Sequence, residues 1–253
     1  MRIAISGTAC QGKTTLIKDF LEQWPNYVTP KKTYRDIIKE NNLDHSSKTN
    51  KKTQWEILNF QIEETQKYRS GDNVVFDRCP LDNLVYSMWA VEQPDNDIDE
   101  AFISKCIPLV RESFRNLDII FFTPITKVAP VPMEEDDLRD TNPEIVESID
   151  NIFKAVHRDH EHNPKTTFFI VDDKPPIIEV FGSRTERIDL LKLYIDDDGD
   201  AASPGNILDE ETLEEIKKLE EVWKDVDPEE HSYIKKEMEK KIAEDKRRNR
   251  LNT

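Results

Sequence analysis

The sequence predicts a three-layer α/β fold, in which helices cover both faces of a mainly parallel central sheet. One observation is that the apolar run Ile3-Ala4-Ile5 leads through a glycine-containing turn into a helical pattern. Another is that strand-length apolar runs recur at 74–76 and 119–122, separated by helical segments. Strands that alternate with helices favour an α/β sheet. The 253 residues suffice for one large domain or for a domain with an appendage.

The turn after the first predicted strand carries the complete motif G-x-x-x-x-G-K-[ST] at residues 7–14. The strand before it and the helix after it are the context that this phosphate-binding loop requires. Gly7 and Gly12 permit backbone conformations that point N–H groups at phosphate oxygens, and the helix N-terminus adds a favourable dipole. Lys13 can reach the β- and γ-phosphates, and the Thr14 hydroxyl can ligate Mg²⁺.

The motif therefore predicts ATP and Mg²⁺ as cofactors, with Lys13 also a catalytic residue. The alternative is an ordinary glycine turn, but only six glycines occur in the chain and two of them stand at the motif positions. The predicted nucleotide-binding residues are Gly7, Thr8, Ala9, Cys10, Gln11, Gly12, Lys13, Thr14 and Thr15.

The composition restricts the partners and the compartment that we expect. The formal net charge is −16, so nucleic acid is a poor partner unless a local basic groove exists. The sequence shows no membrane-spanning apolar run and no signal-peptide pattern, so we expect no membrane association. Three cysteines without metal or disulfide spacing indicate a reducing compartment. We expect the cytoplasm, or the host cytoplasm if the protein is viral.

Residues 27–35 contain a candidate substrate-binding cluster. The β-prone run from Tyr27 to Pro30 predicts a second strand. Beyond it, Tyr34 could stack on a base and Arg35 could pair with a phosphate or a carboxylate. The alternative is that this cluster forms the solvated start of a helix.

A long helical pattern over about 53–68 carries two glutamines, Gln54 and Gln61. Either side chain could read the edge of a base. A solvent-facing position is the more common one for glutamine and is the expectation here.

The run from Asn73 to Arg78 predicts a buried strand with a carboxylate at its end. Ligands of open α/β sheets bind at the carboxyl edge of the strands, where Asp77 is expected. Asp77 is therefore a candidate Mg²⁺ ligand or base, and Arg78 is a candidate catalytic and substrate-binding residue. A helix is predicted to begin at Pro80, and its Tyr86 is expected in the core.

A helix over about 99–115 and a central strand over 118–122 precede residues 124–142, which are rich in proline and then acidic. A connection of this length favours a mobile lid. Arg139 is its candidate catalytic residue, because a lid arginine can stabilise charge on a transferring phosphoryl group. The alternative is that Arg139 pairs with the acidic residues around it.

The end of the main domain is predicted to hold a helix over about 142–157, strands at 166–171 and 177–181, and a closing helix. Ser183 is expected to cap the closing helix, and Glu186 completes a capping box. By analogy with this class of fold alone, the segment 182–187 is placed near the nucleotide base.

Three segments are expected along the chain: an α/β domain over 1–195, a linker over 196–208 and a charged helical extension over 209–253. The extension carries one narrow apolar stripe within a charge-dense sequence. It could pack on the domain, pair with another subunit in a homodimer, or stay mobile.

The order of these elements resembles the P-loop nucleoside and nucleotide kinases, and more closely the NadR-like group that includes phage-encoded ATPase- or kinase-like proteins. The resemblance rests on residues 7–14, 77–82 and 138–141 and covers roughly residues 1–195. It implies transfer of the ATP γ-phosphoryl group to a nucleoside-like or nucleotide-like acceptor. By that resemblance, Lys13 and Thr14 bind phosphates and Mg²⁺, and Asp77 serves as metal ligand or base. Arg78 and Arg139 would stabilise charge.

The chain departs from the deoxynucleoside kinases at one point, because residues 29–32 lack the carboxylate that ends their second strand. Either Asp77 takes the role of base, or the acceptor is already a phosphate. Two alternative functions stay open. One is a kinase for hydroxymethyl-pyrimidines in DNA, which the net charge disfavours; the other is an ATP-dependent switch or binding module that uses the extension to contact a partner.

Overall fold

The computed structural model describes residues 1–45, 48–94, 96–127, 130–131, 141–162 and 174–202. The chain divides into two compact units, Met1–Ala201 and Ala202–Thr253, and all the elements named here belong to the first. The strands are β1 (Arg2–Ser6), β2 (Val74–Asp77), β3 (Ile119–Phe122) and β4 (Ile177–Glu179). The helices are α1 (Lys13–Gln23), α2 (Tyr34–Glu40), α3 (Lys51–Gln66), α4 (Pro80–Val91), α5 (Glu100–Ser113), the 3₁₀ helix η2 (Phe114–Asn116), α6 (Pro143–His162) and α7 (Arg184–Leu191).

The four strands form a sheet in the order β2-β1-β3-β4, and every pair is parallel. The central strand β1 pairs through Ile3 with Val75 of β2 and with Ile119 of β3. The carboxyl ends of all four strands therefore lie at one edge, and the loops that follow them meet there.

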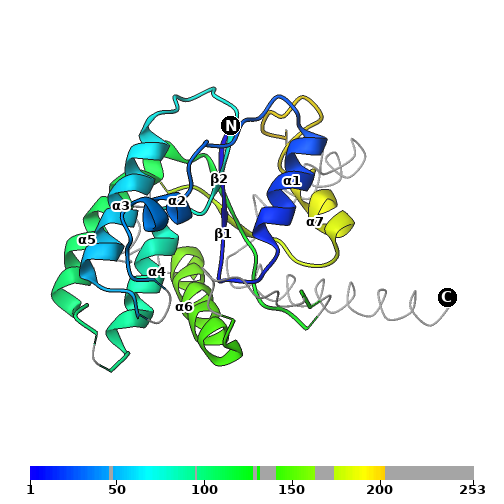
Figure 1. Cartoon of the computed structure of the whole chain (residues 1–253). Helices are drawn as coiled ribbons and strands as arrows, with labels where there is room; N and C mark the ends of the chain where they lie inside the picture. The colour runs from blue at the N-terminus through cyan, green and yellow to red at the C-terminus, as the bar shows by residue number, and fades with distance from the viewer. Residues whose placement is uncertain (46–47, 95, 128–129, 132–140, 163–173, 203–253) are drawn as a thin grey trace, which may run out of the picture. The chain divides into compact units, whose positions relative to one another are not determined.

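Helices cover both faces of the sheet, as Figure 1 shows for α1 and α7 on one side and α3 to α6 on the other. Successive strand residues point to opposite faces. Ala4 and Phe122 therefore join the core under α3, α4, α5 and α6, whereas Ile3 and Phe121 join the core under α1 and α7. Both cores are closed to water, so the predicted three-layer α/β architecture is confirmed.

The predicted second strand is wrong. Of the run from Tyr27 to Pro30, only Val28 pairs with the sheet, in a single bridge to Val74. Tyr27 instead turns its side chain into the core, where its hydroxyl donates to the Gly199 carbonyl at 2.6 Å, and Pro30 has no N–H to donate to a ladder. The expected strand at 166–171 and the extension at 209–253 lie outside the described residues.

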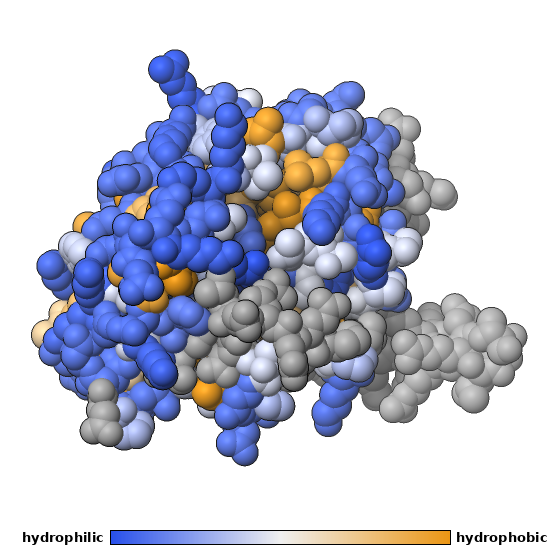
Figure 2. All heavy atoms as spheres, in the orientation of Figure 1, coloured by the Kyte–Doolittle hydropathy of each residue, from blue (hydrophilic) through white to orange (hydrophobic). Residues whose placement is uncertain are grey.

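The polar composition is visible on the surface of the described residues. The face in Figure 2 is largely hydrophilic, and hydrophobic residues gather on it in a few patches, the most conspicuous of them in the upper middle of the view. Within the described ranges, no helix is long and apolar enough to cross a membrane.

Candidate active site

The phosphate-binding loop connects β1 to α1 at the carboxyl edge of the sheet. Its backbone is left-handed at Cys10 and at Gly12, with φ angles of 58° and 72°. Gly7 has a φ of 134°, and a Cβ atom there would lie 2.8 Å from the Thr123 carbonyl oxygen. Both the backbone angle and this close approach to the end of β3 require glycine at position 7.

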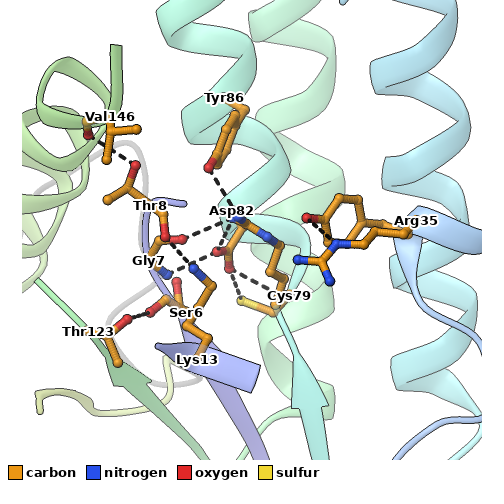
Figure 3. A network of polar contacts seen from close by, with 12 residues as sticks. Ser6, Gly7, Thr8, Lys13, Arg35, Cys79, Asp82, Tyr86, Thr123 and Val146 are labelled. Carbon is orange, nitrogen blue, oxygen red and sulfur yellow. Dashed lines mark hydrogen bonds and ion pairs between the residues drawn. The ribbon is translucent and has the colours of Figure 1, made fainter. Parts of the chain in front are cut away.

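Neighbouring elements hold the loop from several sides. The Thr8 hydroxyl donates to the Val146 carbonyl of α6 at 3.0 Å. On the other side, the buried Arg187 of α7 donates from Nη1 to the Gln11 carbonyl at 2.7 Å. Lys13 Nζ donates to the Thr8 carbonyl, so the lysine side chain lies across the loop (Figure 3). The loop is therefore positioned by tertiary contacts as well as by its own turns.

Asp82 supports the first residue of the loop from α4. Its Oδ1 accepts a hydrogen bond from the Gly7 backbone N–H at 3.1 Å, and its Oδ2 accepts one from the Cys79 N–H at 3.1 Å (Figure 3). The second bond is part of the capping box that starts α4, so one carboxylate both begins the helix and holds the loop. Burial, and next the Asp82 carboxylate, raise the pKa of the Cys79 thiol, which keeps it neutral.

Arg78 joins the loop, Asp82 and two tyrosines. Its backbone is left-handed with a φ of 75°, a strained conformation for a residue with a side chain. Its Nη1 donates to the Gly7 carbonyl at 3.0 Å and to Asp82 Oδ1 at 3.1 Å, and its Nη2 donates to the Tyr86 hydroxyl at 3.1 Å. The guanidinium carbon also lies 5.2 Å from the centroid of the Tyr34 ring. These contacts hold the buried Arg78 side chain in one position and supply partners for its charge.

A cationic cavity opens over the loop, and we call it the phosphate cavity. Two loop hydroxyls, Thr14 and Thr15, contribute to its lining. No carboxylate among the described residues lines it, although the chain as a whole is strongly acidic. The cations that line it are Lys13, Lys18, Arg35 and Arg78. This set of donors suits a polyphosphate.

A second cavity, which we call the acceptor cavity, lies beside the first. It is lined by two tyrosines, by aliphatic side chains of α2, α3 and α6, and by side-chain amides and hydroxyls. These residues include Tyr34, Ile38, Thr53, Gln54, Ile57, Gln61, Asn83, Tyr86, Val146 and Ile149. Ala9 and Arg78 line both cavities, so the two spaces meet at these residues.

The site lies within a match to a known family. The family model described as an AAA domain matches residues 2–171, which is more than half of the chain. The chain belongs to the AAA domain family. No curated protein matches its sequence.

Solved structures share the fold of this AAA domain protein at low sequence identity. Deoxyadenosine kinase from M. mycoides with dCMP and dCDP is 16% identical, with a TM-score of 0.52 over 76% of this chain and 96% of the other. The same enzyme with dATP is 18% identical, with a TM-score of 0.52 over 76% of this chain and 97% of the other. The NadR protein in complex with NR is 15% identical with a TM-score of 0.53, over 80% of this chain but only 53% of that chain. These similarities confirm the fold that the resemblance implies.

In the AAA domain chain, the structure places the predicted site residues in different parts of the site, and Arg78 lines both cavities. All nine predicted nucleotide-binding residues lie in the loop or the first turns of α1, and those from Ala9 to Thr15 line the phosphate cavity. Tyr34 and Arg35 begin α2, and Arg35 lines the phosphate cavity while Tyr34 lines the acceptor cavity. Arg139 lies outside the described residues.

Asp77 is set apart from the phosphate cavity. It ends β2 and lines a smaller cavity with Tyr34, Gln61 and Arg78. Among the described residues, none forms a hydrogen bond or salt bridge with its carboxylate. Asp77 thus lies on the acceptor side of Arg78 and not among the residues that line the space over the loop.

Sequence reasoning missed several residues of the acceptor cavity. Gln54 and Gln61 are only 5% and 6% exposed, so the expected solvent-facing positions are wrong. Tyr86 packs against the core as expected, but it also lines the cavity and accepts a hydrogen bond from Arg78, which the sequence did not predict. The spacing of Arg78 and Asp82, four residues apart across a helix start, is the one local signal of their pairing.

Proposed function

We propose that the protein transfers the γ-phosphoryl group of ATP to a nucleoside- or nucleotide-type acceptor. The observation that supports this most is the meeting of the two cavities at Ala9 and Arg78. A cationic space over a phosphate-binding loop suits the donor, and an adjoining space with aromatic and amide side chains suits a base and sugar. Phosphoryl transfer needs this juxtaposition, because its catalysis depends mainly on positioning and charge stabilisation.

The residues of the phosphate cavity fit ATP with Mg²⁺. Lys13 would hold the β- and γ-phosphates, and the Thr14 hydroxyl would be one protein ligand to Mg²⁺, which would neutralise charge on the phosphates. The described residues contain no group of three or more His, Cys, Asp or Glu side chains that could hold a metal. Magnesium in such sites keeps several waters and binds phosphate oxygens and one or two protein groups, so Asp77 at the end of β2 is proposed as the second protein group, directly or through water.

In the transfer, an acceptor oxygen forms a bond to the γ-phosphorus, while the bond between the γ-phosphorus and the oxygen that bridges to the β-phosphate breaks and ADP leaves. Arg78 lies where the cavities meet and would stabilise the negative charge of the phosphoryl group in transit. If the acceptor is a hydroxyl, its proton must leave, and Asp77 is the proposed base. Asp82 is less suited to that role, because it already accepts from Gly7, Cys79 and Arg78. Arg139 is proposed as a second charge-stabilising residue.

The test is phosphoryl transfer from γ-labelled ATP with Mg²⁺ to a panel of acceptors. The panel holds nucleosides, nucleoside monophosphates, nicotinamide riboside and DNA that contains hydroxymethyl-pyrimidines. Label on a free nucleoside or nucleotide supports the proposal, and label on the DNA favours the DNA kinase. Label released only as free phosphate, or not released at all, overturns the proposal in favour of a nucleotide-dependent switch.

A further inference from the structure

The acceptor cavity contains a chain of hydrogen-bonded amides that leaves one oxygen atom unsatisfied. Gln54 Nε2 donates to the Thr49 hydroxyl at 2.8 Å. Asn83 Nδ2 donates to the Gln54 backbone carbonyl at 3.1 Å and to Gln54 Oε1 at 2.6 Å. Asn83 is 4% exposed, and its Oδ1 atom is buried with no hydrogen-bond partner among the described residues.

The orientation of the Asn83 amide is decided by this network. A backbone carbonyl can only accept hydrogen bonds, so the atom of Asn83 that lies 3.1 Å from the Gln54 carbonyl must be the nitrogen. If the amide were rotated, two oxygens would face each other and the bond to Gln54 Oε1 would also be lost. Oδ1 of Asn83 is therefore held as an acceptor, and it cannot become a donor by rotation.

Two other polar atoms at this cavity are also unsatisfied, but their roles are adaptable. Thr53 Oγ1 and Gln61 Oε1 are buried without a partner. A hydroxyl can donate or accept, and no hydrogen bond from another described residue fixes which end of the Gln61 amide faces a ligand. Leaving a buried acceptor unpaired is costly, and buried polar groups in proteins almost always have a partner. Of these three oxygen atoms, only Asn83 Oδ1 is fixed as an acceptor and so needs a hydrogen-bond donor as its partner.

We infer that the acceptor cavity selects a planar base that bears an N–H donor, such as an amino or carboxamide group, against the base that has an oxygen in its place. This inference rests on the proposed function, because it names the acceptor of the same site. The tyrosine and isoleucine side chains around the amides suit the faces of a planar ring. A keto oxygen directed at Asn83 Oδ1 would meet another acceptor, whereas an amino group would complete its hydrogen bonding.

Matched pairs of nucleosides test this contact. Cytidine and uridine, like adenosine and inosine, differ by an exocyclic amino group against a keto oxygen and by the adjacent ring nitrogen, which accepts in the amino member and carries a hydrogen in the keto member. Nicotinamide riboside and nicotinic acid riboside differ by a carboxamide against a carboxylate. We expect the amino or carboxamide member to bind at least about 10-fold more tightly in at least one pair, because a site that hydrogen-bonds a donor rejects the analogue that lacks it.

The experiment measures the dissociation constants of all six nucleosides for the full chain by isothermal titration calorimetry, without ATP. Asn83→Leu is expected to lower the preference within the favoured pair to about 3-fold or less. Ser87→Ala is the matched control, since Ser87 lies one turn along α4 and donates only to the Asn83 backbone carbonyl at 2.9 Å. The control should keep the preference of the natural sequence.

The outcomes separate this inference from the proposed function. Equal or tighter binding of the keto and acid members, or no binding of any nucleoside, overturns the inference without use of a variant. A preference that survives in a folded Asn83→Leu protein also overturns it. A preference for the amino members without any transfer of label would support the inference while the kinase proposal fails.

Discussion

Two arginine–aspartate pairs stand at opposite ends of the sheet, one partly exposed and one buried, and they make different use of the same chemistry. At the amino end, Arg2 of β1 donates to Asp118, which precedes β3, from its backbone N–H at 2.7 Å and from Nη2 at 2.7 Å. At the carboxyl end, Arg78 pairs with Asp82 at 3.1 Å, and both side chains also bond to the backbone of Gly7.

The difference lies in what else each pair contacts. Within the described part of the chain, the Arg2 side chain hydrogen-bonds to Asp118 alone, so that pair joins two neighbouring strands and borders no cavity described above. Arg78 spreads its donors over a loop carbonyl, a carboxylate and a tyrosine, has a left-handed backbone, and lines both cavities. One ion pair therefore joins regular strands at the amino end of the sheet, whereas the other positions the phosphate-binding loop at the carboxyl end.

Lys13→Ala should produce the largest effect, which we expect on ATP turnover and not on stability. We expect turnover of ATP to drop by at least about 100-fold, because a preorganised cation on the phosphates is lost. The melting temperature should change by no more than a few degrees, since Lys13 lines the phosphate cavity and belongs to neither of the two main cores. Labelled-ATP assays and thermal unfolding measure the two effects. Full activity in this variant would refute the assignment of the carboxyl end as the nucleotide site.

Arg78→Met and Arg2→Met test whether the two pairs differ in stability as well. Removing Arg78 leaves the Asp82 carboxylate, whose side chain is 1% exposed, buried without its cation, which should cost about 3–5 kcal/mol. The Asp118 side chain is 30% exposed and can be hydrated after Arg2→Met, so we expect less than about 2 kcal/mol there. Urea unfolding gives both values. An equal or larger cost for Arg2→Met would contradict the comparison.

The smallest effect is a dependence of stability on pH at the amino end. Burial alone would raise the pKa of Asp118, but hydrogen bonds from the Arg2 side chain and backbone outweigh it and lower that pKa below 3.8. A lowered pKa adds stability that is fully present above the unfolded value of 3.8 and is lost as the pH falls below it through the lower pKa of the folded state. Asp118→Asn should therefore cost less than about 1 kcal/mol at pH 6 and still less at pH 3. A cost that grows toward pH 3 would show that the ion pair is not its source.

Sequence patterns predicted helices correctly where a few consecutive residues determine where the helix begins. The expected capping box of Ser183 and Glu186 is present, with Ser183 N–H donating to the Glu186 carboxylate at 2.7 Å. The helix expected at Pro80 begins there. By contrast, the β-prone run at 27–30 forms only one bridge, because burial of Tyr27 in the core overrides its local preference.

The sequence by itself determined the α/β class and the phosphate-binding loop, because strand period, helix caps and glycine positions act within a few consecutive residues. Only the tertiary structure decided that Asp82 bonds to Gly7, 75 positions away, and that Asn83 meets Gln54 across two helices. Such contacts depend on strand register and helix packing, which bring distant side chains within hydrogen-bond reach and which no short segment encodes. The location of the proposed nucleotide site was therefore readable from one stretch of sequence, whereas the amides proposed to select its acceptor meet only because α3 and α4 pack against each other.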